Sequence, residues 1–244
     1  RGRTLSFDED FDDRTEAQTK RFKEGLSHIN EWYGHSDVYT FILDKDMPVG
    51  CENIRAIEER GWCIFEKLVS SISKIGCSCL SLRQLPPSEE VESFDSLCNQ
   101  CTMSREPPMR PDEFEQMLRK GVDDETQEKG KGIVFTSNKD LTEVIIPQFR
   151  LAFLRLMGQA QKLIYTKLGW GDEELEKMIS TLVYANSHCS GLDPWPTRRA
   201  DANIDGLYLQ LNNFTEAGIM RLGGALAERN VLPNLTKLGI TLPS

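Results

Sequence analysis

The sequence contains no uninterrupted apolar run long enough to cross a membrane. Its most apolar stretch, residues 145–156, is broken by Arg150 and Arg155, whereas a membrane span needs roughly 18 uncharged apolar residues. A basic excess is also missing, because 29 Lys and Arg against 38 Asp and Glu give a formal net charge of −9, and the cations are scattered. An acidic chain repels a phosphate backbone, so we expect neither a membrane span nor a nucleic acid partner.

Motifs of several common catalytic sites are absent as well. The 3 histidines form no pair at the i, i+4 spacing of helical metal ligands, and residues 129–132 lack the spacing of a phosphate-binding P-loop. No Gly-x-Ser-x-Gly motif of a serine nucleophile occurs. We therefore expect the chain to bind no cofactor.

The 7 cysteines show no regular disulfide framework, and their number is odd. A chain of this length can build an apolar core without disulfides, so we expect free thiols in a reducing, intracellular compartment, most simply the cytoplasm. The sequence shows no signal peptide and begins with Arg1, which leads us to expect a fragment or a processed product.

Two cysteine pairs, Cys77-x-Cys79 and Cys98-x-x-Cys101, are the arrangement of thiols that could hold a metal ion. Tetrahedral zinc accepts four cysteines, although only the second pair has the spacing of a zinc knuckle. Buried cysteines also commonly serve as small apolar side chains. We expect apolar packing, with a zinc site as the alternative.

Short apolar runs alternate with helical patterns along the first two thirds of the chain. We expect strands at residues 4–7, 38–43, 77–82 and 133–136, and helices at residues 15–33, 60–74, 111–120 and 147–168. Residues 83–111, rich in proline, serine and acid, are expected to form a long loop. Four strand–helix units in succession predict an α/β fold with a mostly parallel open sheet and flanking helices.

The end of the chain carries a repeat. Ile204-x-x-Leu207-x-Leu209-x-x-Asn212 recurs as Leu235-x-x-Leu238-x-Ile240, a shift of 31 residues, with a helical pattern over 214–228 between them. This strand–helix unit resembles the ribonuclease-inhibitor type of leucine-rich repeat. We expect an α/β domain over 1–169 and a repeat tail over 170–244. The alternative is one more βαβ unit of the same domain.

The resemblance to leucine-rich repeats implies a binding surface. Repeat tails present one face of their strands to protein partners. In this chain Tyr208 and Gln210 alternate with the inward-facing leucines and are the side chains expected on that face.

In an open parallel sheet, ligands bind beyond the carboxyl ends of the strands. That rule nominates polar side chains that follow the predicted strands: Asp8, Asp10, Asp44, Asp46, Arg83, Ser137 and Asn138. The helix that opens with Arg60-Gly-Trp62-Cys-Ile-Phe-Glu66 begins on the same side of the sheet. Arg60 therefore joins this set of candidate ligand-binding residues.

Glu66 is the candidate for chemistry. It lies at the border of the apolar stripe of its helix, four residues after Trp62. A carboxylate sheltered by Trp62 and Phe65 would have its pKa raised by desolvation, which suits acid–base catalysis or stabilisation of an oxocarbenium ion. The alternative is that Trp62 and Phe65 are core residues and Glu66 only caps or salt-bridges at the edge of the helix.

A strand followed by a Trp-Cys-x-x-Glu helix resembles the TIR domain family, and residues 7–74 resemble a TIR-like module of algal and protist proteins. The matching residues are Asp8, Arg14-Thr15, Phe22-Lys23, Ile29-Asn30, Trp32-Tyr33 and the motif from Arg60 to Glu66. The resemblance implies a TIR/flavodoxin-like fold. In enzymatic members the matching glutamate cleaves NAD at the nicotinamide ribosyl bond. The first strand and phosphate-side loop of the family would lie before Arg1.

Two functions follow from these observations. We expect a non-catalytic protein-interaction or scaffold module, or an accessory subunit of a larger assembly, with protein partners. The alternative is a TIR-like NAD glycohydrolase in which Glu66 is catalytic, Trp62 shapes the pocket, and Asp8 and Asp44 bind the nucleotide. Whether Glu66 faces a concave pocket separates the two.

Overall fold

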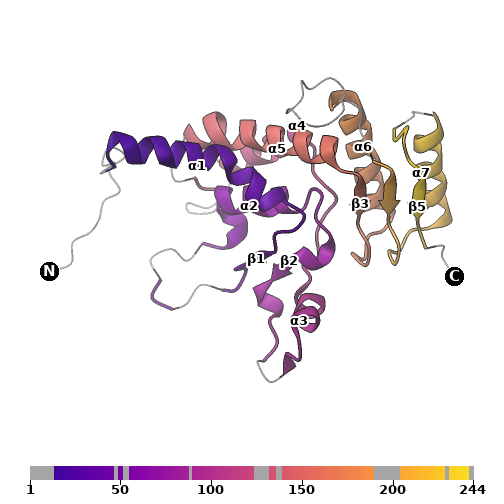
Figure 1. Ribbon diagram of the computed structural model, residues 1–244, viewed down its shortest axis with the longest axis horizontal. Coiled ribbons are helices and arrows are strands. Elements are labelled where there is room, and N and C mark those ends of the chain that lie inside the picture. Colours follow the sequence, from indigo (N-terminus) through magenta and orange to yellow (C-terminus); the bar gives the residue numbers. More distant parts are fainter. Residues whose placement is uncertain are drawn as a thin grey trace.

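The computed structural model describes residues 14–46, 49–51, 55–87, 90–123, 132–135, 139–189, 204–228 and 231–241. Helices α1 (Glu16–Gly34) and α5 (Ile146–Gln159) lie along one side of the molecule, and two small parallel sheets follow one another beneath and beside them (Figure 1). The mixed α/β class and the parallel strand pairing predicted from the sequence are confirmed. Among the helices of the described segments, none is long and apolar enough to cross a bilayer.

Helix α1 begins where its sequence predicts. The Gln18 amide donates to the Thr15 hydroxyl and the Thr15 amide donates to the Gln18 side chain, which forms a capping box. Its second half packs against α2 (Gly61–Ser70) and α5. There the buried Asn30 amide donates to the backbone carbonyl of Gln148 at 3.0 Å. The first half of α1 is exposed, including the apolar side chain of Phe22.

The first sheet pairs β1 (Thr40–Ile42) with β2 (Cys79–Ser81), and α2 is the crossover helix between them. Both strands fall within predicted ones, and both are shorter than predicted. Phe65 and Val69 of α2 are fully buried in the main hydrophobic core. The apolar stripe predicted for this helix is therefore its core-facing side.

The single open sheet predicted from the sequence is wrong. The strands divide into a two-stranded sheet, β1-β2, and a three-stranded sheet, β3-β4-β5. Residues 132–135 contribute only an isolated parallel bridge between Val134 and Arg60, and residues 4–7 lie outside the described part of the chain. The predicted long loop is also interrupted by a helix, α3 (Phe94–Cys101), which the Ser93 side chain caps.

The helix predicted over 147–168 ends early. Helix α5 follows a π-helical turn (Asp140–Ile145) and stops at Gln159, and Lys162–Ile164 form strand β3. Leu163 and Tyr165 alternate into the core and are fully buried. A short apolar run is locally compatible with a helix or a strand, and here the pairing with β4 stabilises the strand.

The second sheet carries the predicted repeat. Helix α6 (Asp172–His188) precedes β4 (Gly206–Tyr208), and α7 (Glu216–Glu228) connects β4 to β5 (Lys237–Gly239). Gly206 pairs with Lys237 and Leu207 with Leu238, so the shift of 31 residues in the sequence is the strand register. Strand β3 pairs with the other edge of β4, which joins residues on both sides of the expected boundary at 169/170 in one sheet.

Arg105 connects the end of helix α2 to strand β3. Its buried guanidinium donates to the backbone carbonyls of Ser71 and Ile164, each at 3.2 Å, and lies over the Tyr165 ring at 5.0 Å. The Trp170 indole nitrogen donates to the Arg105 carbonyl at 2.7 Å. Helix α4 (Pro111–Asp123) adds Phe114, which stacks on Phe149 of α5. A single apolar core therefore runs from α2 to the final helix.

Candidate functional site

Glu66 lies on the side of α2 that faces α1. Its carboxylate accepts a hydrogen bond from the Tyr33 hydroxyl. Burial raises the pKa of Glu66, and the Tyr33 hydrogen bond opposes that rise. Burial and the neighbouring Glu66 charge together raise the pKa of Tyr33 to about 12. The pKa of Glu66 is thus raised, as expected from the sequence. The group that contacts its carboxylate is Tyr33 of the neighbouring helix.

Trp62 contacts a different element. Its indole nitrogen donates to the Asp140 carboxylate at 2.9 Å, and its ring packs edge-on against Phe65 with centroids 6.0 Å apart. Asp140 begins the π-helical turn that leads into α5. Trp62 therefore ties α2 to α5, while Glu66 ties α2 to α1. Nothing in the local sequence around Asp140 marks it as the partner of a residue 78 positions away.

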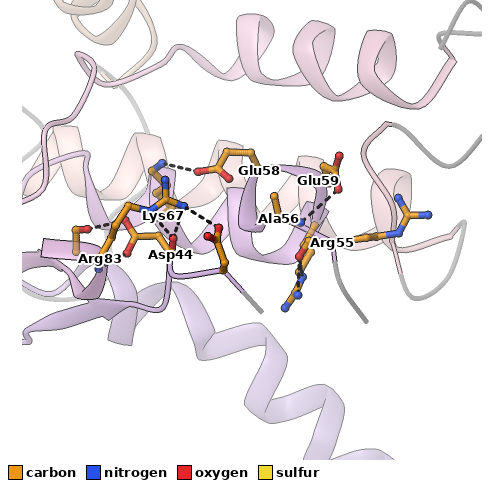
Figure 2. A network of polar contacts seen from close by, with 10 residues as sticks. Asp44, Arg55, Ala56, Glu58, Glu59, Lys67 and Arg83 are labelled. Atoms are coloured by element: carbon orange, nitrogen blue, oxygen red, sulfur yellow. Dashed lines mark hydrogen bonds and ion pairs between the residues drawn. The ribbon is translucent and has the colours of Figure 1, made fainter. Parts of the chain in front are cut away.

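Asp44 joins the carboxyl ends of β1 and β2. Its carboxylate accepts from the Ser81 hydroxyl at 2.6 Å and from the Arg83 amide at 2.9 Å, and its backbone carbonyl accepts from the Arg83 guanidinium. Figure 2 shows Asp44 and Arg83 lying together, with the Lys67–Glu58 ion pair beside them. Burial alone would raise the pKa of Asp44, but the hydrogen bonds from Ser81 and Arg83 outweigh it and lower the pKa.

A cavity of about 220 Å³ opens at this edge of the sheet. Its charged lining residues come from three segments: Asp44, Lys45, Asp46, Arg55, Arg60 and Arg83. The structure thus brings four residues nominated from the sequence to one cavity: Asp44, Asp46, Arg60 and Arg83. Glu66 and Trp62 do not line it, whereas Asp8, Asp10, Ser137 and Asn138 lie outside the described residues. Lys45 and Arg55 also line the cavity but were not predicted, although Lys45 stands beside Asp44 at the same strand end.

The outward face of the β3-β4-β5 sheet carries the residues nominated for partner binding. Tyr208 and Gln210 are half-buried because each lies against a glycine. The Tyr208 ring covers Gly206 of its own strand, and the Gln210 amide covers Gly239 of β5. A side chain at either glycine would collide with these groups. The two glycines therefore let Tyr208 and Gln210 lie flat on the strands.

Strand β5 ends the sheet with an uncovered leucine. Leu163 of β3 and Leu207 of β4 are fully buried, whereas Leu238, at the matching register position of β5, is 47% exposed. Among the described residues, no strand pairs with the outer edge of β5. The row of leucines that is buried on β3 and β4 therefore extends to β5, where Leu238 is left partly uncovered.

The four candidate zinc ligands divide between two apolar clusters. Cys98 and Cys101 pack with Leu80 and Cys77, while Cys79 packs with Ile42 and Met103. The Cys79 thiol donates to the Ser70 carbonyl, and burial raises its pKa. Within the described residues, no three His, Cys, Asp or Glu side chains are arranged to hold a metal ion.

In comparisons with known proteins, no family model, curated protein or solved structure matches this chain.

Proposed function

We propose that this chain is a non-catalytic protein-interaction module whose partner binds at the β5 end of the β3-β4-β5 sheet. The observation that carries the proposal is the exposure of Leu238, whose counterparts Leu163 and Leu207 are completely buried. A leucine at a position that repeats a core position is expected to be covered, because covering it removes apolar surface from water.

The strand–helix unit supports a repeat of the leucine-rich type. Units of this kind bury their apolar sides against their neighbours, so the end of a stack offers the same surface that the interior units bury. Asn212 contributes in the manner of a repeat asparagine, because its side chain bonds the backbone of the preceding β3 segment and of its own turn. A partner strand added to β5 would cover Leu238 and use the outer backbone groups of that strand.

The candidate catalytic side chains have structural partners, which also favours an interaction module. Glu66 bonds Tyr33, Trp62 bonds Asp140, and the Asp44 carboxylate is occupied by Ser81 and by the Arg83 amide. Each of these contacts joins two secondary-structure elements. They supply a structural reason for the presence of these polar groups.

Leu238→Glu tests the proposal. The protein would be immobilised and exposed to native extract, and stoichiometric partners would be identified by mass spectrometry. Because a partner would cover only the exposed half of Leu238, its apolar contribution is about 0.7–1.5 kcal/mol. A buried glutamate charge adds a desolvation cost, so the variant should bind its partner at least about tenfold more weakly. The fold should survive, since Leu238 is half exposed already.

Trp32→Glu is the matched control. Trp32 is 69% exposed on α1, a helix that packs against α2 and α5, so its replacement reduces exposed apolar surface without changing any residue of the β3-β4-β5 sheet. A partner kept by the Trp32 variant and lost by the Leu238 variant supports the proposal. Equal retention by both variants, or no stoichiometric partner for the wild type, contradicts it.

A TIR-like NAD glycohydrolase is the second candidate, and one observation favours it. Burial raises the pKa of Glu66, as the ribosyl-cleaving role would require of a sheltered carboxylate. Release of nicotinamide from NAD is the assay that decides whether this carboxylate has a catalytic role.

A further inference from the structure

The cavity at the carboxyl ends of β1 and β2 has a charge opposite to that of the whole chain. Four cationic side chains line it (Lys45, Arg55, Arg60 and Arg83), against two acidic ones (Asp44 and Asp46), in a protein of net charge −9. A cleft lined mainly by one sign of charge concentrates counter-ions of the other sign. This surface is therefore suited to an anion that the rest of the molecule repels.

The acidic groups around the cavity have partners of their own. Asp44 is held by Ser81 and the Arg83 amide, and Asp46 lies 4.0 Å from Arg83 with its carboxylate fully exposed to water. Figure 2 shows Glu59 on the far side of the network, where it accepts a hydrogen bond from the Ala56 amide. The two lining carboxylates stand against four cationic side chains, so a cationic excess remains in the cavity.

Arg60 is the central cation. Its guanidinium is half-buried and donates twice to the Arg55 carbonyl, at 2.7 and 3.1 Å, which fixes its position but uses a neutral acceptor. An arginine carries five N–H donors, so donors remain for a ligand. Within the described segments, neither Arg60 nor the exposed Lys45 forms an ion pair with a carboxylate.

Arg83 completes the set from the neighbouring strand end. It donates to the Asp44 carbonyl through Nε and one terminal nitrogen, which orients the guanidinium and leaves its other donors for a ligand. Fixed guanidinium groups match the oxygens of phosphate in charge and in geometry, and bonds between two ionised groups are the stronger kind. A cavity of about 220 Å³ has room for one such group with its attachment.

We propose that this cavity binds a phosphate-bearing small molecule, with Lys45, Arg60 and Arg83 as its cationic contacts. The site is separate from the β5 end of the molecule, so its existence does not depend on the protein-interaction proposal.

Inorganic phosphate is the probe, at constant ionic strength maintained with chloride. Calorimetric titration gives the Kd, and amide NMR shifts locate the contact. We expect saturable binding, with the largest shifts at residues 43–46, 55–60 and 83. Lys45→Gln and Arg60→Gln should each raise the Kd about tenfold, because each removes a charge-assisted contact.

Arg119→Gln is the matched control, since Arg119 is an exposed arginine paired with Glu115 on α4, away from the cavity. It should leave the Kd unchanged. If Arg60→Gln unfolds the loop, Lys45→Gln still decides, because Lys45 is exposed and holds no described element in place. Absence of saturable binding, equal loss in the Arg119 variant, or equally tight binding of acetate would each overturn the proposal.

Discussion

Replacing Asn212 with alanine removes four hydrogen bonds that hold two strands of the second sheet together. The Asn212 amide nitrogen donates to the carbonyls of Tyr165 and Leu209, at 2.8 and 3.0 Å. Its carbonyl oxygen accepts from the amides of Leu168 and Trp170, at 3.0 and 3.2 Å. Three of these partners follow β3, so one side chain fixes the turn after β3 to the turn after β4.

The expected cost follows from what the substitution leaves behind. A hydrogen bond contributes about 0.5–1.5 kcal/mol net, and backbone groups that lose their partner in a sheltered place cost more than that. Asn212 is only partly buried, so water replaces some of the lost contacts. We expect Asn212→Ala to lower the free energy of unfolding by about 2–4 kcal/mol.

Equilibrium unfolding in urea, followed by tryptophan fluorescence, measures this loss. The midpoint should fall at an unchanged m-value. Asn213→Ala is the control, because the exposed Asn213 donates a single bond to the Gly169 carbonyl and its loss should cost less than about 1 kcal/mol. Equal effects of the two substitutions would refute the assignment of Asn212 as the link between the strands.

Two further substitutions test buried and half-buried charges. Lys74 is fully buried, its ammonium donates to the Thr40 hydroxyl at 2.8 Å, and burial lowers its pKa. Between the lowered folded pKa and the ordinary value of 10.5, the unfolded state binds more protons, so stability rises with pH there. Lys74→Met should therefore raise the free energy of unfolding by about 1–3 kcal/mol at pH 7. Urea titrations at several pH values should show this gain shrinking as the pH approaches 10.5, and a gain independent of pH would contradict the reasoning. Glu66→Gln should make the protein slightly more stable at neutral pH, because a raised folded pKa means that ionised Glu66 lowers stability above that pKa. NAD cleavage by the wild type that Glu66→Gln abolishes would instead favour the enzyme.

The sequence by itself determined the features that depend on neighbours close along the chain. Helix α1 begins at the predicted place because its capping box joins residues three positions apart. The pairing of β4 with β5 follows the 31-residue repeat, since equivalent residues of a repeat take equivalent places. The carboxyl-end rule also selected Asp44, because consecutive parallel strands end at one edge whatever else surrounds them.

Tertiary structure alone decided the rest. Residues 162–164 form a strand although their pattern continues a helix, because β4 offers backbone partners that a longer α5 would leave unpaired. Arg105 and Lys74 are buried although both are cationic, because carbonyl and hydroxyl acceptors from distant segments meet them. The cavity that joins Lys45, Arg60 and Arg83 likewise depends on three loops meeting. Contacts between residues far apart in the chain form only once the core has closed, and local residue pattern carries no record of them.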